Sequence, residues 1–465
     1  MHGARRAARP SRSKMLLRRL LAPGLLLAGV TALLAPPSTW AYAVYGDVLD
    51  LTQRDFRILN NFTGALANTN QVPDPDFPGS LGAELAIRKG VAEWGSRPHG
   101  SGLTDPTQPL LGSGGTNFDA FYAGRALAPG NRDANIVSSV PTSGVGLAQT
   151  DIPIGDGWRI RFFEGSATWN DDPGGVLAGT SPVDLQGVMT HEYGHALGLD
   201  HSGVPGATMG ITTANAGLDL RSIEQDDIDG LTFLYGALDP AKPAIDAYEL
   251  PGGGVVRLLG AGFDPTDNEV WFTPADPAVP GDGTPVRVTG VPALAGSGGT
   301  VLELPIPADA GPGDVAVVLP AAGAAALSNV FPFDPQREPW TAPTTYGVPG
   351  TSNAGTPVRL TWLGLPSVTA GSFGLRVTGG ASAGFGLVIS GDAQAQVPTG
   401  YGTLLVGGPL QRVAAVPLFL GSGQVQVPLG PAPVIGSRRY YQVWLPDGSS
   451  ARGVFSDGLA VEIVP

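Results

Sequence analysis

The sequence predicts a multidomain chain in which an α+β domain is followed by all-β sandwich modules. Up to Gly236, stretches with helical periodicity alternate with short apolar, β-prone runs. After the linker-like segment 239–243, helical periodicity disappears and short β-prone runs are separated by glycine and proline. A chain of 465 residues is long enough for two or three domains, each with its own hydrophobic core.

Residues 1–43 predict a removable secretion signal. Seven arginine and lysine residues precede an apolar run from Leu20 to Ala35, and Ala41-Tyr42-Ala43 gives a small-x-small cleavage site. The run is short and contains proline and glycine, which leaves an uncleaved membrane anchor as the lesser alternative. Arg18-Arg19 keeps twin-arginine export open beside the general route. We expect a secreted, periplasmic or cell-surface protein, with no stable membrane span after cleavage near Ala43.

Charge and cysteine content exclude several classes of partner. The signal holds seven of the 27 basic residues and no acidic ones, so the remaining chain carries 20 basic residues against 40 acidic ones, a formal charge of −20. Such a chain should repel nucleic acid and anionic membranes. Because the sequence contains no cysteine, stability must come from packing and metal rather than disulfides.

The segment from His191 to His201 reads as the pattern HExxHxxGxxH. A catalytic zinc needs three protein ligands and one open position, and two histidines four residues apart project from the same face of a helix. Gly198 can adopt the left-handed conformation that ends a helix, so His201 can turn back toward His191 and His195. Glu192 can then reach a metal-bound water as general base. The alternative, an ordinary helix with exposed histidines, is disfavoured because three of only five histidines occupy these positions.

Two helix starts can be predicted around this motif. Ser181 as N-cap, Pro182 at the first helical position and Asp184 near the third predict a helix over about 182–197. Ser222 and Gln225 predict a capping box for a later helix that continues to residue 234 or 235.

These motifs resemble the metzincin metalloproteases and, within them, the matrixins (matrix metalloproteinases, peptidase M10). Met209 lies eight residues after His201 and fits the structural methionine turn beneath the metal in that family. The resemblance covers residues 44–237 and implies an α+β metzincin domain with a mixed twisted sheet, three helices and a zinc cleft. It also implies that Asp226 and Asp227 brace the methionine turn or the mature N-terminus, although one of them could be a solvated first-turn charge.

The segments upstream of the motif suit the same family. Residues 55–59, 135–140 and 158–163 predict strands, and 85–94 predicts an amphipathic helix. The stretch 172–178 resembles the loop and edge strand that precede the active-site helix of matrixins. By that resemblance Val176, Leu177 and Ala178 would pair with an extended substrate backbone.

The sequence departs from the family at its secondary metal sites. Matrixins commonly hold a structural zinc through histidines, but Gly179 stands at one of those positions and His99 reads as an ordinary loop residue. We therefore expect one Zn²⁺ per chain. Asp171 and Asp172 could bind Ca²⁺ through carboxylate oxygens, or could form a plain acidic turn, with neither favoured.

Latency must also differ from the animal members, which silence the zinc with a propeptide cysteine. This chain has no cysteine. Asp47 or Asp50 could cap the metal instead, or the N-terminal strand could be free.

The remaining chain predicts two all-β modules. Residues 243–334 resemble the IPT/TIG group of immunoglobulin-like domains, and residues 348–465 predict a second module of unknown role. Neither contains histidine. Their aromatic residues could form a platform for a glycan or protein of the cell surface or matrix, although core or edge packing is the favoured alternative; these residues include Trp271, Trp340, Trp362, Tyr440, Tyr441 and Trp444.

Together these features predict a secreted zinc endopeptidase that hydrolyses protein or peptide substrates. The alternative is a surface-binding or adhesive protein whose metzincin domain is latent or restricted to one partner.

Overall fold

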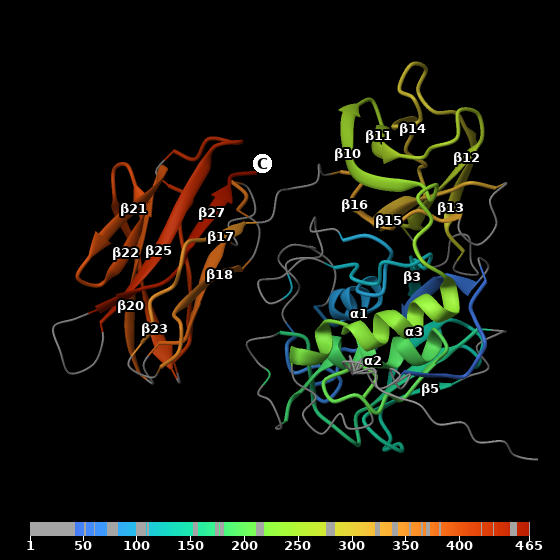
Figure 1. The fold of residues 1–465 in the computed structure, drawn as a ribbon, viewed down its shortest axis with the longest axis horizontal. Coiled ribbons are helices and arrows are strands. Elements are labelled where there is room, and N and C mark those ends of the chain that lie inside the picture. Colours follow the sequence, from blue (N-terminus) through green and yellow to red (C-terminus); the bar gives the residue numbers. More distant parts are fainter. Residues whose placement is uncertain are drawn as a thin grey trace, which may run out of the picture. The chain divides into compact units, whose positions relative to one another are not determined.

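A computed structural model gives the fold (Figure 1). It describes residues 42–464 except 51–52, 60, 72–81, 99–107, 109–110, 152–156, 173–175, 177–180, 211–217, 276–283, 321–325, 337–342, 353–354, 364–365, 369–372, 381–382, 420, 431 and 447–452. No helix in these described ranges is long and apolar enough to cross a membrane.

A five-stranded sheet forms the framework of the N-terminal part. Its strand order is β3-β2-β4-β6-β5, and every pairing is parallel except that of β5 with β6. The strands are β2 (Asp55–Leu59), β3 (Phe121–Ala126), β4 (Ile136–Val140), β5 (Ala148–Asp151) and β6 (Arg159–Phe163). The three strands predicted near residues 55, 135 and 158 are therefore confirmed, and β5 is an antiparallel strand at the edge of the sheet.

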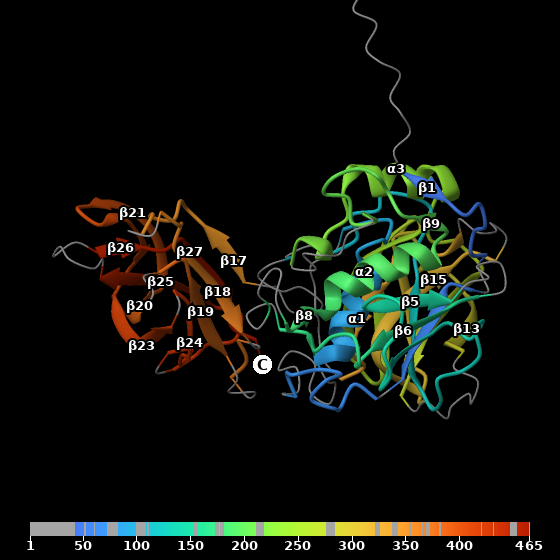
Figure 2. The same ribbon diagram turned by 90° about the horizontal axis from the view of Figure 1, so that it is seen from below.

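Three α-helices occur in the described part of this region, as the sequence led us to expect: α1 (Gly82–Ala92), α2 (Leu185–Ala196) and α3 (Gln225–Tyr235). A short 3₁₀ helix, η3 (Leu218–Arg221), precedes α3. Helices α1 and α2 run side by side (Figure 2), so closely that a Cβ on Gly90 would lie 2.9 Å from Met189 Cβ. The core between helices and sheet contains fully buried aromatic side chains, among them Trp94, Trp158 and Tyr193.

Both predicted helix starts were wrong by a few residues. Val183 and Asp184 form a short strand, β8, which pairs with β7 (Trp169–Asn170), and this pairing keeps the backbone extended where a helix was expected. Helix α2 therefore begins at Leu185, and Asp184 is its N-cap, accepting a hydrogen bond from Gly187 N at 2.9 Å. Helix α3 is capped at Glu224, whose N–H donates to Asp227 at 2.9 Å.

A short ribbon connects the start of the described chain to the end of α2. Strand β1 (Ala43–Val44) pairs antiparallel with β9 (Leu199–Asp200), which immediately precedes His201. The backbone N–H of Tyr45 extends the contact by donating to Gly198 O at 2.8 Å.

Beyond residue 243 the described chain is all β, as predicted. A three-stranded sheet (β10-β11-β14) and a four-stranded sheet (β13-β12-β15-β16) share one apolar core, which makes this region the first sandwich. Its strands are β10 (Ala244–Gly252), β11 (Val255–Ala261), β12 (Asn268–Pro274), β13 (Val286–Val291), β14 (Val301–Pro305), β15 (Ala310–Val318) and β16 (Phe331–Phe333).

The C-terminal strands build a second apolar core. One sheet has the order β17-β27-β25-β20-β23 with β26 on β25, and smaller ones are β18-β19-β24 and β21-β22. The strands are β17 (Thr344–Tyr346), β18 (Arg359–Leu363), β19 (Gly374–Thr378), β20 (Ala383–Gly391), β21 (Ala393–Thr399), β22 (Gly402–Gly407), β23 (Gln411–Phe419), β24 (Gly423–Gln426), β25 (Arg438–Pro446), β26 (Gly453–Phe455) and β27 (Gly458–Glu462).

Side chains of the first sandwich contact the outer edge of β3. Tyr122 donates its backbone N–H to the Asp314 carboxylate at 3.0 Å, and its carbonyl accepts from the Thr273 hydroxyl at 2.6 Å. Asp314 also forms a buried ion pair with Arg88 of α1 at 2.7 Å. An apolar cluster adjoins these contacts: Phe121, Ala123, Trp271, Ala316, Val318, Ala326, Leu327 and Val330. Polar side chains thus satisfy backbone groups that an edge strand would otherwise leave unpaired.

Candidate metal centre

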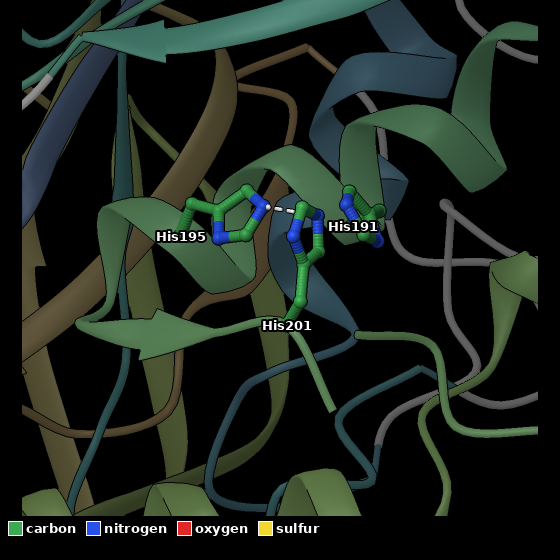
Figure 3. Close-up of side chains that lie close together, drawn as sticks. All are labelled: His191, His195 and His201. Atoms are coloured by element: carbon green, nitrogen blue, oxygen red, sulfur yellow. Dashed lines mark hydrogen bonds between the residues drawn. The ribbon is translucent and has the colours of Figure 1, made fainter. Parts of the chain in front are cut away.

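Three histidine side chains converge beside helix α2. His191 and His195 project from one face of α2, and His201 returns to them from the residue after β9 (Figure 3). One ligand atom from each ring can be chosen so that all three lie within 4.8 Å of one another, and the Nε2 atoms of His195 and His201 are 3.3 Å apart. Tetrahedral zinc with ligands at ~2.0–2.1 Å places neighbouring donor atoms about 3.3 Å apart. The donor set therefore fits the ion that the motif implies.

Backbone carbonyls fix the two helical histidines in a ligand-ready form. His191 Nδ1 lies 2.6 Å from Thr208 O, and His195 Nδ1 lies 2.9 Å from Leu199 O. A carbonyl can only accept, so each Nδ1 carries the proton and each Nε2 keeps its lone pair for a metal. Burial, reinforced by His195, lowers the pKa of His191 to about 3, and burial likewise lowers the pKa of His195. Both rings are therefore neutral near pH 7, as metal ligands must be.

Gly198 makes the turn that brings His201 into the cluster. Its φ of +101° lies in the left-handed region expected from the sequence, and a Cβ there would stand 2.4 Å from Asp47 O. Only glycine satisfies both demands without strain. The N-terminal segment therefore packs directly on the turn that carries the third histidine.

Asp200 links this N-terminal segment to His201. Its Oδ1 accepts from His201 N at 2.7 Å and from the Tyr45 hydroxyl at 3.1 Å. The Tyr45 ring also lies beside His195, with centroids 6.1 Å apart. Burial, followed by the hydrogen bond to Asp200, raises the pKa of Tyr45 to about 12, so the hydroxyl stays a donor at neutral pH. No sequence motif marks Tyr45, because only the β1–β9 pairing brings it to the metal centre.

Met209, the predicted methionine of the turn, packs against α2 between its two histidines. The methionine is buried, and a Cβ on Gly194 would come within 2.2 Å of its sulfur. Asp227 accepts from Thr208 N at 2.8 Å and from Met209 N at 3.0 Å, while Asp226 accepts from the Ser202 hydroxyl at 2.6 Å. Both aspartates therefore brace the loop between His201 and the methionine turn, which favours that interpretation over solvated first-turn charge.

Glu192 is buried next to the first histidine and is held by Thr150 of β5. The Thr150 hydroxyl lies 2.8 Å from Glu192 Oε2 and 2.8 Å from Glu192 O. Burial raises the pKa of Glu192 to about 7, against the lowering effect of the Thr150 hydrogen bond. No sequence motif marks Thr150, and only the pairing of β5 at the sheet edge places it over α2.

Most of the predicted substrate strand falls outside the described residues. Val176 is buried and belongs to no strand, and Leu177 and Ala178 fall outside the described residues. The antiparallel edge strand beside α2 is β5, about 25 residues upstream along the chain. The role of residues 176–178 as a substrate strand stays a prediction.

The Asp171-Asp172 pair makes protein contacts. Asp171 Oδ2 accepts from Asn70 Nδ2 at 3.3 Å, and Asp172 forms an ion pair with Arg376 at 2.8 Å. The histidine triad is the one group of three or more such ligand residues that comes together in the described ranges. Calcium binding at Asp171 and Asp172 and the plain acidic turn both stay predictions. His99, Gly179 and Trp340 lie outside the described residues.

Known proteins resemble the part of the chain that forms this centre. Residues 139–236 match the Matrixin family, peptidase M10. Metalloendoproteinase 2-MMP of Arabidopsis thaliana is 46% identical over 63 residues, 13% of this chain and 16% of the relative. Metalloendoproteinase 5-MMP of the same plant is 38% identical over 92 residues, 18% of this chain and 25% of the relative. Neutrophil collagenase of Homo sapiens is 37% identical over 82 residues, 17% of this chain and 16% of the relative.

The chain thus spans a quarter or less of the length of these relatives. The matched residues contain β5, β6, α2, α3, the histidine triad and Met209. Residues 139–236 are therefore similar to matrixin domains, including those of metalloendoproteinases.

Proposed function

We propose that this protein is a secreted zinc-dependent endopeptidase that hydrolyses peptide bonds in proteins. The observation that carries the proposal is the convergence of three histidines beside the buried carboxylate of Glu192. Bound zinc would supply Lewis-acid chemistry, polarising the scissile carbonyl and lowering the pKa of a water molecule.

The chain's own residues would move the proton. Glu192 accepts it from the attacking water and returns it to the departing amine. A general base works best when its pKa lies near the operating pH, and burial raises the pKa of Glu192 to about 7. His191, His195 and His201 would hold one Zn²⁺ per chain, which elemental analysis of the purified protein can check.

The edge strand β5 is the best candidate for substrate alignment. In the described part of the chain β5 pairs with β6 alone, so its other edge can take an extended peptide as an added strand. This replaces the predicted position of the substrate strand at 176–178 with residues 148–151. Substrate preference along the peptide would then depend on side chains that flank β5 and α2.

Residues 243–334 and 348–465 would serve as an IPT/TIG-like domain and a second β module that tether the enzyme to a cell-surface or matrix glycan or protein. Supporting this, each region has its own apolar core and neither contains histidine. Of the proposed aromatic platform, Trp271, Trp362 and Tyr441 are buried, which favours a structural role for these three. Binding of the full-length Glu192→Ala variant to cell envelopes and extracellular matrix would test tethering, and failure to bind either would contradict it.

The function is tested by casein hydrolysis with purified residues 44–465, with zinc quantified in every sample. The controls are Glu192→Ala and the chelated wild type. We expect activity in the wild type alone, with zinc retained by Glu192→Ala. One bound zinc without hydrolysis would favour the alternative, an adhesive protein with a latent or partner-restricted domain, and absence of zinc would overturn the metal centre.

A further inference from the structure

Thr150 stands out because its hydroxyl contacts the proposed general base from a different structural element. It is the third residue of β5 and pairs with Ile160 of β6 across the ladder. Its Oγ1 is 2.8 Å from both the carboxylate Oε2 and the backbone carbonyl of Glu192. The contact therefore joins the edge of the sheet to the helix that carries the histidines.

Strand β5 holds this hydroxyl in a fixed position. Asp151, the next residue, forms ion pairs with Arg159 at 2.7 Å and Arg161 at 2.9 Å, both from β6. The Asp151 side chain is only 9% exposed, so these pairs are sheltered from water. The pairing of β5 with β6 and the ion pairs of Asp151 therefore hold the backbone of Thr150 in place. The β-branched side chain of Thr150 in addition has few rotamers.

A glutamate side chain has three rotatable bonds, so a general base on a helix needs an outside contact to keep one orientation. We propose that Thr150 is a positioning residue that holds the Glu192 carboxylate in the orientation needed to take a proton from the attacking water, an inference that rests on the proposed peptidase function. Engagement of Oε2 by the hydroxyl leaves Oε1 to accept the proton. Because Thr150 also belongs to the proposed substrate edge, the same strand would align the peptide and the base.

The first test removes the hydroxyl with little change in shape. Thr150→Val should lower kcat about 10- to 100-fold, the loss typical of a misplaced catalytic group, while KM and zinc content stay close to wild type. Thr150→Ser keeps the donor and should recover most of kcat. Thr142→Val, at an exposed threonine in the turn before β5, is the matched control and should leave kcat unchanged. A Thr150→Val enzyme with wild-type kcat, or a Thr150→Ser enzyme as impaired as Thr150→Val, would overturn the proposal.

A second measurement does not depend on turnover. Acetohydroxamate binds a metal and presents a hydroxyl proton to an adjacent base, so its affinity for the zinc-loaded protein reports the placement of Glu192. Calorimetry should show affinity reduced several-fold by Thr150→Val in the wild-type background and unchanged in the Glu192→Ala background, because Thr150 acts through Glu192. Equal losses of acetohydroxamate affinity in both backgrounds would show that Thr150 does not act through Glu192.

The two proposals can therefore fail separately. The zinc-loaded wild type could hydrolyse no protein while Thr150→Val still weakens acetohydroxamate binding only when Glu192 is present. In that case the peptidase proposal fails and the positioning of Glu192 by Thr150 stands. If casein is cleaved and Thr150→Val changes acetohydroxamate affinity equally with and without Glu192, the peptidase proposal stands and the proposed role of Thr150 fails. If no zinc is bound, both fail.

Discussion

Asp184 and Arg221 form a buried ion pair at the start of helix α2. The guanidinium approaches both carboxylate oxygens, at 2.7 and 2.8 Å, and the two side chains are 0% and 3% exposed. The same carboxylate caps α2 through Gly187 N. One aspartate thus ends β8, begins the helix that carries His191 and Glu192, and neutralises a buried charge on η3.

Asp184→Ala should destabilise the protein by about 3–5 kcal/mol, because it leaves Arg221 buried without its counter-charge and removes the helix cap. Urea unfolding of the metal-free protein measures the loss. Glu303→Ala breaks the exposed ion pair with Arg257 and should leave the urea midpoint unchanged. Equal effects of the two substitutions on the urea midpoint would show that the buried Asp184–Arg221 pair contributes no more to stability than an exposed ion pair.

Gly198→Ala should weaken both folding and zinc binding. The new Cβ would meet Asp47 O at 2.4 Å in a left-handed conformation, at a cost of at least ~1–3 kcal/mol, and relief of the clash would displace His201. Competition with a coloured zinc chelator should show a weaker site. Gly203→Ala is the control, since its Cβ would have nothing within 4 Å. Retention of wild-type zinc affinity by Gly198→Ala would contradict this account of the turn.

Glu93→Gln should stabilise the protein in a pH-dependent way. Burial raises the pKa of Glu93 to about 7 from an ordinary 4.5, so the folded state holds a proton that the unfolded state releases. The wild type therefore loses stability as pH rises from about 4.5 through 7, whereas glutamine, which cannot ionise, does not. The difference in the free energy of unfolding between variant and wild type, measured by urea unfolding at each pH, should grow over that window and then level off, reaching ~1–3 kcal/mol above pH 7. A pH-independent difference would exclude ionisation as the cause.

Asp314→Ala should destabilise the N-terminal part of the chain although the substitution lies in the first sandwich. It leaves Arg88 of α1 buried without a counter-charge and Tyr122 N without an acceptor, for an expected loss of about 3–5 kcal/mol. Intrinsic tryptophan fluorescence during urea unfolding would measure this loss of stability. Asp309→Ala, at an exposed aspartate just before β15, is the control. Indistinguishable midpoints would mean that the contact with β3 contributes little to stability.

The metal ligands could be predicted almost completely from the sequence, because they lie within eleven consecutive residues and helical geometry fixes how His191 and His195 project. Local chemistry also predicted the left-handed turn at Gly198 and the helical location of Asp226 and Asp227. The helix starts were missed by two or three residues because cross-chain pairing of β7 with β8 and the side chain of Asp227 decided the caps.

The order of the strands in the sheet cannot be predicted from such local rules. The pattern near Val176 looked like an edge strand, but β5 forms the edge of the sheet because residues 148–151 pair with residues 159–162 of β6, which in turn pairs with β4. Thr150, Tyr45 and Asp314 likewise acquire their roles only when distant segments meet.

The sequence by itself determined the chemistry of this protein: three neutral imidazoles and one carboxylate at spacings that suit a single zinc ion. Those residues are close in the chain, so short-range backbone geometry places them. Only the tertiary structure decided how that chemistry is held, through Thr150 on Glu192, Tyr45 on Asp200 and Arg221 on Asp184. These contacts join residues separated by 37 to 155 positions, and they arise from the packing of strands and helices rather than from any local pattern.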